Sequence, residues 1–328
     1  MTVPPLLVRT ARFGWQWQWQ LLMNGLAPAD DKGRFRRAEQ GYRSVLGEAP
    51  FSAEPDRYVL IVGESCPWAH RCWLLLALRD LLPVVALRRV HPDPHGGRWV
   101  FGEPFEGCSS LADLYGLCQV RAAAGSNPRA TVPVLWDRHT RRIVNNESSE
   151  LIVQLNRAFD AGPAATVGDL EPAPLRPRIE QWSQLLQQHV NNGVYQCGFA
   201  RTQAAYDEAS TALFSALDAL EQALADGRPW LCGEQLSLAD VRLFPSLARW
   251  EAAYASLFRC LARPLWSFPS LWNWRSRFFG LNGVAATCPS EAWRRDYFAS
   301  LFPLNPSGLV PSAPTLATLV EWTPPQQP

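Results

Sequence analysis

Cys66-Pro67-Trp68-Ala69-His70-Arg71 decides the fold of this chain, because of what lies on either side of it. The apolar run Tyr58-Val59-Leu60-Ile61-Val62 before it predicts a buried strand, and Cys72-Trp73-Leu74-Leu75-Leu76-Ala77-Leu78 after it predicts a helix. Cys66 therefore lies where a strand ends and a helix begins. There the helix dipole and unpaired backbone N–H groups favour a thiolate over a thiol, so we expect Cys66 to be reactive and to have a lowered pKa.

Cys66 lacks a nearby cysteine with which it could form a disulfide. The position three residues further along, where a second cysteine would close a local disulfide, is Ala69. A mixed disulfide at Cys66 must then be resolved by an external thiol, and glutathione is the obvious candidate. The alternative is a buried structural cysteine at a helix start, since free cysteines are often buried. The rest of the sequence favours the reactive cysteine.

The composition is that of a globular protein with room for two domains. Of 328 residues, 47% are hydrophobic and 19% are charged, and the net charge of +1 gives no electrostatic reason to expect nucleic acid or a membrane as partner. No apolar run reaches the ~18 residues of a membrane span, and Trp15-Gln16-Trp17-Gln18-Trp19-Gln20 interrupts any signal-peptide core. The eight cysteines show neither zinc-ligand spacing nor a disulfide framework. We therefore expect reduced thiols, no metal and a cytoplasmic location.

Strands and helices alternate through the first half of the chain. Residues 1–55 are expected to be an irregular extension that wraps a first domain at 56–160. The predicted elements of that domain are strands at 58–62, 84–90, 131–136 and 142–144, and helices at 70–82 and 147–159. Residues 91–128 hold too many prolines and glycines for a simple connection and are interpreted as an insertion. The order β-α-β-insertion-β-β-α is that of the thioredoxin fold.

The second half of the chain is predicted to be helical. Residues 161–177 carry four prolines and two glycines and are interpreted as a linker. Beyond it, Leu213, Leu217, Leu220 and Leu224 repeat at the spacing of an amphipathic helix, and Ser237-Leu238-Ala239-Asp240 predicts a capping box. We expect an all-helical domain at 178–302, followed by a Pro-rich tail at 303–328 in which no packed helix continues.

Three motifs in this frame resemble those of one family. They are Cys66-Pro67-Trp68-Ala69-His70-Arg71, Thr131-Val132-Pro133-Val134-Leu135-Trp136-Asp137 and Ile143-Val144-Asn145-Asn146-Glu147-Ser148-Ser149-Glu150. The domain order is similar to that of a glutathione transferase, with a thioredoxin-like domain followed by an all-helical one. The motifs are similar to those of the glutathionyl-hydroquinone reductases, also called the Xi class. Residues 191–195, 198–200, 239–245 and 305–311 add to the resemblance, which runs from residue 55 to residue 311.

The resemblance implies a reductase that removes glutathione from glutathionyl-hydroquinones. The Cys66 thiolate would attack the sulfur of the adduct and retain the glutathionyl group as a mixed disulfide, and hydroquinone would leave with a proton from a tyrosine. A second glutathione would then release glutathione disulfide. The implied partners are glutathione, as cosubstrate, and aromatic or quinone conjugates of glutathione. Two alternatives remain open, namely an omega-type thioltransferase or dehydroascorbate reductase, and a protein that binds glutathione or aromatic ligands without turnover.

On the glutathione side, the resemblance implies contacts from Trp99, Arg129, Val132, Pro133, Glu147 and Ser148. A proline at a strand start predicts a cis bond before Pro133, and by resemblance the Val132 backbone would then pair with the cysteinyl residue of glutathione. Glu147 and Ser148, at a predicted helix start, suit the ammonium and the carboxylate of the γ-glutamyl residue. The alternatives are a plain edge-strand proline and simple N-capping of that helix.

On the second-substrate side, the resemblance implies catalytic roles for Tyr195 and Tyr297 beside Cys66, and pocket contacts for Trp68, Tyr254 and Phe298. A phenol can hold a quinol oxygen and relay a proton, although a tyrosine in a helical domain can equally be a packing residue. Trp68, next to the thiol, is expected to stack on an aromatic substrate. The family has polar residues where this chain has Phe298 and Leu301, which predicts a less polar pocket.

Two further expectations concern surfaces. A homodimer is expected, because the stretch Trp15-Gln16-Trp17 offers apolar surface that a monomer would expose. Arg242 and Arg249, both in the predicted helical domain, are expected on a helix surface or in interhelical pairs. Cys72, six residues after Cys66, is expected in the core.

Overall fold

The computed structural model describes residues 3–93, 97–119 and 129–323. Its first domain is built on a six-stranded sheet in the order β4-β3-β2-β1-β5-β6. The strands are β1 (Tyr58–Gly63), β2 (Val85–Pro92), β3 (Trp99–Phe105), β4 (Cys108–Ser110), β5 (Val134–Asp137) and β6 (Arg142–Asn145). β1 is buried along its whole length and pairs parallel with β2 and antiparallel with β5. The predicted thioredoxin-like domain is confirmed.

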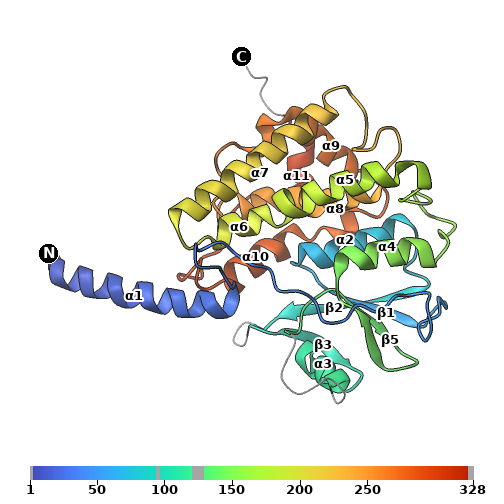
Figure 1. Ribbon diagram of the computed structural model, residues 1–328, viewed down its shortest axis with the longest axis horizontal. Coiled ribbons are helices and arrows are strands. Elements are labelled where there is room, and N and C mark those ends of the chain that lie inside the picture. The colour runs from blue at the N-terminus through green and yellow to red at the C-terminus, as the bar shows by residue number, and fades with distance from the viewer. Residues whose placement is uncertain (1–2, 94–96, 120–128, 324–328) are drawn as a thin grey trace.

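Two helices cover the face of the sheet that is turned toward the second domain (Figure 1). They are α2 (Pro67–Leu78) and α4 (Ser148–Ala158). α2 begins at Pro67 and not at His70 as predicted, because a proline fits the first helical turn. It ends before Asp80, whose φ of 53° does not belong to a right-handed helix. Cys66 is consequently the N-cap residue of α2.

The insertion contains regular structure that its composition did not predict. β3 and β4 form a hairpin that adds two antiparallel strands to the edge of β2. α3 (Leu111–Gln119) lies on the opposite face of the sheet from α2 and α4 (Figure 1). The parts of the predicted insertion at 94–96 and 120–128 lie outside the described residues.

The second domain is helical, as predicted, and lies on the α2 and α4 layer (Figure 1). Its α-helices are α5 (Arg176–Leu185), α6 (Gly193–Phe199), α7 (Gln203–Leu224), α8 (Leu238–Ala248), α9 (Pro269–Phe279), α10 (Ser290–Ser300) and α11 (Leu316–Glu321). Two π-helical segments, Leu186–Asn191 and Trp250–Tyr254, and three short 3₁₀ turns, Ala173–Leu175, Leu265–Ser267 and Ala285–Thr287, complete it. The capping box is present, since the Asp240 carboxylate accepts from both the N–H and the hydroxyl of Ser237.

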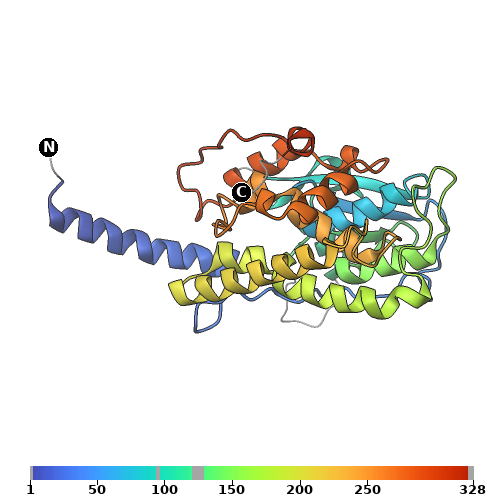
Figure 2. The same cartoon turned by 90° about the horizontal axis from the view of Figure 1, so that it is seen from above.

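The extension was predicted to be irregular, and for its first part this is wrong. α1 (Pro5–Leu26) is a long helix that projects from the body (Figures 1 and 2). The helix was missed because Trp and Gln alternate there with a period of two, which is the period of a strand. A helix that projects from the body buries no face along most of its length, so its sequence need not show a one-sided apolar stripe. α1 contacts the body near its C-terminal end, where Met23 is buried and the Trp19 indole donates to the Pro303 carbonyl (3.0 Å). Within the described ranges, no helix is long and apolar enough to cross a membrane.

The tail also contains a packed helix, contrary to the prediction. α11 forms in the proline-free stretch of the tail, where the Thr315 hydroxyl accepts from the N–H of Thr318. Leu316 is buried, and the ring of Trp322 packs edge-on against Trp272, with ring centroids 5.4 Å apart. Short-range capping thus overrides the overall proline content of the segment.

Candidate functional site

Cys66 lies at the N-terminus of α2, half-buried, with its Sγ 3.6 Å from the carbonyl oxygen of Val132. Burial raises the pKa of the Cys66 thiol, while the N–H groups of Ala69 and Trp68 and the charges of Arg249 and Arg37 lower it only in part. The net direction is upward, so the prediction of a lowered pKa is wrong for the ligand-free protein. The helix N-terminus acts in the expected direction, but the desolvation of the closed pocket outweighs it.

Cys66 borders two cavities that also share Trp99, Arg129 and Tyr195. The smaller has a volume of about 240 Å³ and is closed on the other side by Tyr297 of α10 and by Leu301, the residue after that helix. The larger has a volume of about 420 Å³ and adds Trp68, Val132 and the extension between residues 35 and 41. One side of the thiol therefore faces α10, and the other faces the loop before β5 and the N-terminal extension.

Three of the predicted glutathione residues, Trp99, Arg129 and Val132, border a Cys66 cavity, and Pro133 follows Val132. The bond between Val132 and Pro133 is cis, as predicted, and both residues are buried. The Trp99 ring lies against Gly63, where a Cβ would overlap the indole, so this close approach requires glycine. Arg129 donates from Nη1 to the Leu26 carbonyl (3.1 Å), which connects it to the end of α1.

Glu147 and Ser148 occupy the start of α4. Neither of them is among the described residues that line the two Cys66 cavities. The Glu147 carboxylate accepts from the N–H and hydroxyl of Ser149, both at 3.0 Å, so it forms the N-cap that was the alternative interpretation. Ser148 is wholly buried, and its hydroxyl has no partner among the described residues. Asn146, which the sequence did not single out, borders the larger cavity instead.

Tyr195, Tyr254 and Tyr297 lie close together, although they belong to α6, the π segment at 250–254 and α10. The Tyr297 hydroxyl lies 2.7 Å from that of Tyr195 and 3.1 Å from that of Tyr254. Burial raises the pKa of each phenol well above its ordinary value, so all three remain protonated and can donate. Tyr195 and Tyr297 border the smaller cavity with Cys66, whereas Tyr254 and Phe298 are buried and border neither Cys66 cavity.

Trp68 borders the larger cavity, but its ring already has partners. The guanidinium carbon of Arg37 lies 3.6 Å from the ring centroid and that of Arg71 lies 4.7 Å from it. The Tyr195 ring is stacked on it at 6.1 Å between centroids. Cation–π contacts of this kind stabilise the indole in place. An aromatic substrate would have to share the ring with Arg37.

Arg249 is a site residue whose position the sequence did not predict. It is not on a helix surface but fully buried, and it donates to the carbonyls of Glu64 and Ser65, both at 3.1 Å, just before Cys66. Its Nη1 lies 2.8 Å from Nδ1 of His70, whose pKa is lowered well below the ordinary value by burial and by the Arg249 charge. Nδ1 of neutral His70 therefore accepts from Arg249. Arg249, the C-cap residue of α8, thus holds the loop that leads to Cys66.

Arg242 and Cys72 are placed as expected. Arg242 donates from Nη2 to the Ser149 carbonyl (3.0 Å), which is an interhelical contact between α8 and α4. Cys72 is fully buried in the core, and its pKa is raised by burial. Among the described residues, no group of three or more His, Cys, Asp or Glu side chains could hold a metal ion.

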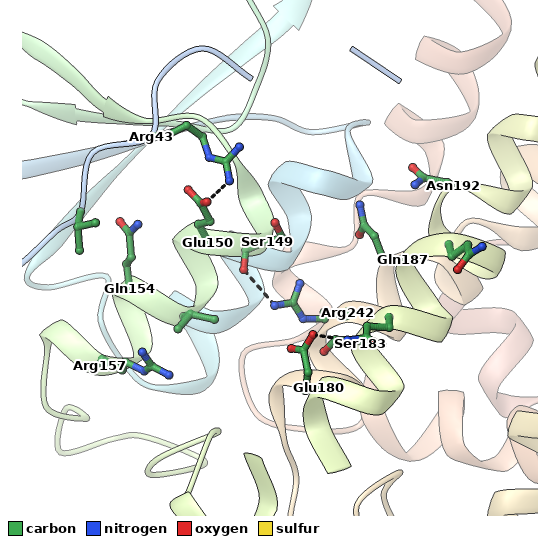
Figure 3. Close-up of a pocket in the computed structure, with 14 residues that line it drawn as sticks. Arg43, Ser149, Glu150, Gln154, Arg157, Glu180, Ser183, Gln187, Asn192 and Arg242 are labelled. Carbon is green, nitrogen blue, oxygen red and sulfur yellow. Dashed lines mark hydrogen bonds and ion pairs between the residues drawn. The ribbon is translucent and has the colours of Figure 1, made fainter. Parts of the chain in front are cut away.

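A hollow larger than either Cys66 cavity lies elsewhere in the described part of the molecule. It has a volume of about 920 Å³ and lies between α4 and the α5 region, with Arg43 and Glu150 at one end and Arg242 and Glu180 at the other (Figure 3). Arg43 forms an ion pair with Glu150 there. Its lining contains no cysteine or tyrosine, unlike the linings of the two Cys66 cavities.

Comparison with known proteins agrees with this arrangement. Residues 65–158 match the family model described as "Glutathione S-transferase, N-terminal domain" and residues 203–278 that described as "Glutathione S-transferase, C-terminal domain". The glutathionyl-hydroquinone reductase PcpF of Sphingobium chlorophenolicum is 41% identical over 286 residues, covering 86% of this chain and 90% of that protein. Glutathionyl-hydroquinone reductase YqjG of Escherichia coli K12 is 36% identical over 299 residues, covering 86% and 89%.

Solved structures resemble the whole two-domain body. The glutathione transferase Xi of Phanerochaete chrysosporium has a TM-score of 0.81 at 35% identity, covering 87% of this chain and 94% of that one. The glutathione-bound structure of YqjG from Escherichia coli has a TM-score of 0.76 at 35% identity, covering 83% and 92%. The likeness therefore extends over both domains.

Proposed function

Because this chain belongs to the glutathione transferase family, in the Xi class of glutathionyl-hydroquinone reductases, we propose that it reduces glutathionyl-hydroquinones at Cys66 with glutathione as cosubstrate. The observation that carries this proposal is the shared cavity of Cys66, Tyr195 and Tyr297. A nucleophilic sulfur and two protonated phenols face the same small volume. Cleavage of a bond between sulfur and an aromatic carbon needs such a pair.

In the first half-reaction, the Cys66 thiolate attacks the sulfur of the glutathionyl adduct. A new S–S bond forms as the bond between sulfur and the ring carbon breaks, and the electron pair of that bond stays on the carbon. Tyr195 or Tyr297 supplies the proton that the carbon takes up, so that free hydroquinone leaves. The ring is thereby reduced, and Cys66 is oxidised to a mixed disulfide.

In the second half-reaction, the thiolate of a second glutathione attacks the glutathionyl sulfur of the mixed disulfide. Glutathione disulfide leaves and the Cys66 thiolate is regenerated. Ala69, at the position where other cysteine motifs have a resolving cysteine, supports the need for this external thiol. The other sulfur nearby, Cys72, is buried and its pKa is raised.

Turnover of glutathionyl-menadiol with glutathione tests this proposal. Wild-type protein should release menadiol, and Cys66→Ala should lose turnover while it still binds glutathione. Intact mass spectrometry after exposure to glutathione disulfide should show one glutathionyl group on wild type and none on Cys66→Ala. Retained reductase activity in Cys66→Ala would contradict the mechanism. Faster reduction of dehydroascorbate than of any glutathionyl-quinone would favour the omega-type alternative.

We also propose that the protein is a cytoplasmic homodimer. The exposed apolar side chains of α1, among them Phe13, Trp15 and Trp17, support an interface on this helix. The eight cysteines are all free thiols, which supports a reducing compartment. Sedimentation equilibrium should give twice the chain mass for the intact protein and the single-chain mass after removal of residues 1–20. A single-chain mass for the intact protein, or recovery in an exported fraction, would contradict these proposals.

A further inference from the structure

The N-terminal extension forms one wall of the larger Cys66 cavity, between residues 35 and 41. The Phe35 ring packs against Phe199 and Tyr195, with centroids 5.3 and 6.5 Å apart. Gln40, at the other end of the segment, accepts from the Thr131 hydroxyl at 2.7 Å and from the Asn146 amide at 3.1 Å. The wall is therefore made of side chains that touch both domains.

Both ends of this wall are fixed by hydrogen bonds to the body. Before it, the Thr202 hydroxyl donates to the Lys32 carbonyl (2.9 Å), and the Arg201 N–H donates to the Gly33 carbonyl (3.0 Å). After it, the N–H of Tyr42 donates to the Asn146 side chain at 3.1 Å. A segment anchored at both ends holds its side chains in defined positions, which is what a binding site requires.

Arg37 is the cation that this wall presents to the cavity. Its guanidinium lies over Trp68, as described above, and borders the same space as Cys66. Its Nη1 is buried and has no hydrogen-bond partner among the described residues. A buried guanidinium N–H without an acceptor is costly, and an anionic group in the cavity would remove that cost.

The charges around the cavity favour an anion as the missing partner. Arg129 also borders it, as does Arg36, which pairs with Asp30 at 3.2 Å. Glu39 is the carboxylate among the lining residues; it is exposed. With Arg36 neutralised by Asp30, the two guanidiniums of Arg37 and Arg129 against one carboxylate still leave a positive excess. Of the ions that could neutralise it, a planar carboxylate matches the fork of an arginine.

We propose that Arg37 is a glutathione-binding residue, supplied by the N-terminal extension, whose free N–H donates to a carboxylate of the glutathionyl group in the Cys66 cavity. This proposal rests on the proposed function for its choice of ligand. Glutathione carries two carboxylates, one on its glycine and one on its γ-glutamyl residue, and either could lie against Arg37. The experiment is designed to distinguish them.

Binding is measured by titration calorimetry in the Cys66→Ala protein, so that no turnover occurs. Arg37→Gln should weaken glutathione binding by about tenfold to a hundredfold, the effect of a lost charge-assisted hydrogen bond. Arg37→Lys should fall between it and the parent, because the charge remains but the fork is lost. Arg34→Gln is the matched control, since this arginine of the same segment pairs with Glu208 on the exposed surface and should change affinity by less than about twofold.

Two analogues identify the carboxylate. One is the glycine ethyl ester of glutathione, and the other has 4-aminobutyrate in place of the γ-glutamyl residue. Arg37→Gln should weaken the analogue that keeps the contacted carboxylate and leave the other unchanged. Unchanged binding of glutathione by Arg37→Gln would overturn the proposal, and so would equal losses for both analogues. Because binding is measured without turnover, a wild-type protein inactive on glutathionyl-menadiol would refute the proposed function and leave this test decisive.

Discussion

Tyr195→Phe tests whether the tyrosine cluster donates the proton that the ring carbon needs. The change removes one hydroxyl, which lies 2.7 Å from that of Tyr297 and borders the cavity of Cys66. General acid catalysis contributes about 10²- to 10⁴-fold, so release of menadiol from glutathionyl-menadiol should slow by a factor in that range. The lost hydrogen bond should cost about 0.5–1.5 kcal/mol of stability, too little to unfold a domain of this size.

The control for this prediction is the second half-reaction of the same enzyme. Disulfide exchange between glutathione and the mixed disulfide expels a thiolate, which needs no proton from a phenol. We therefore expect Tyr195→Phe to slow menadiol release in single-turnover experiments and to leave the exchange rate unchanged. Tyr254→Phe should slow menadiol release less than Tyr195→Phe does and should also leave the exchange rate unchanged, since Tyr254 touches Tyr297 but borders neither Cys66 cavity. Equal loss in both half-reactions, or no loss in either, would show that Tyr195 only packs.

Three further predictions follow from burial and close contact. Because burial raises the pKa of Cys66, the rate of its alkylation by iodoacetamide should increase with pH, with a midpoint above that of free cysteine in the same buffer; a lower midpoint would contradict this. Gly198→Ala should lose about 1–3 kcal/mol in urea unfolding, since a Cβ there would overlap the Phe258 ring, and an unchanged midpoint would refute the close approach. Asp137→Asn should lose about 3 kcal/mol at neutral pH by leaving buried Arg57 without its main partner. Burial acts to raise the pKa of Asp137, but hydrogen bonds from Arg57 and Thr140 outweigh it and leave the pKa lowered. The wild type should therefore lose its extra stability over Asp137→Asn as the pH falls through that pKa. Equal acid sensitivity of the two proteins would contradict the pairing.

The parts of the fold that the sequence predicted are those that short-range patterns determine. The apolar run of β1 and the Ser237–Asp240 capping box each act within a few residues. The gathering of Tyr195, Tyr254 and Tyr297 came from the resemblance, since they lie on three separate segments and nothing in their spacing places them together.

The parts that the sequence did not predict depend on contacts between distant segments. Arg249 holds the backbone before Cys66 from a position 184 residues further along the chain than Ser65. Arg37 enters the site from an extension whose pattern indicated only irregular structure. In both cases the residue type is ordinary, and only the packing of the two domains and the extension gives it a place in the site.

The pKa of Cys66 could not be deduced from the motif for a related reason. A helix N-terminus lowers a thiol pKa locally, whereas burial raises it, and the extent of burial depends on how α10 and the extension close over the sulfur. The motif therefore predicts correctly that the helix N-terminus lowers the pKa of Cys66, but it cannot predict that burial raises the pKa by more.

The charge of Cys66 also acts on the pKa of Tyr195 in the direction that the proposed reaction needs. Burial is the main cause of the raised pKa of Tyr195, and the charges of Tyr254 and Cys66 raise it further. While Cys66 is a thiolate, its charge therefore helps to keep the phenol protonated. As the mixed disulfide forms, that negative charge passes to the ring carbon, because the electron pair of the broken bond stays there. The phenol is thus still protonated when the ring carbon becomes the base that takes up its proton.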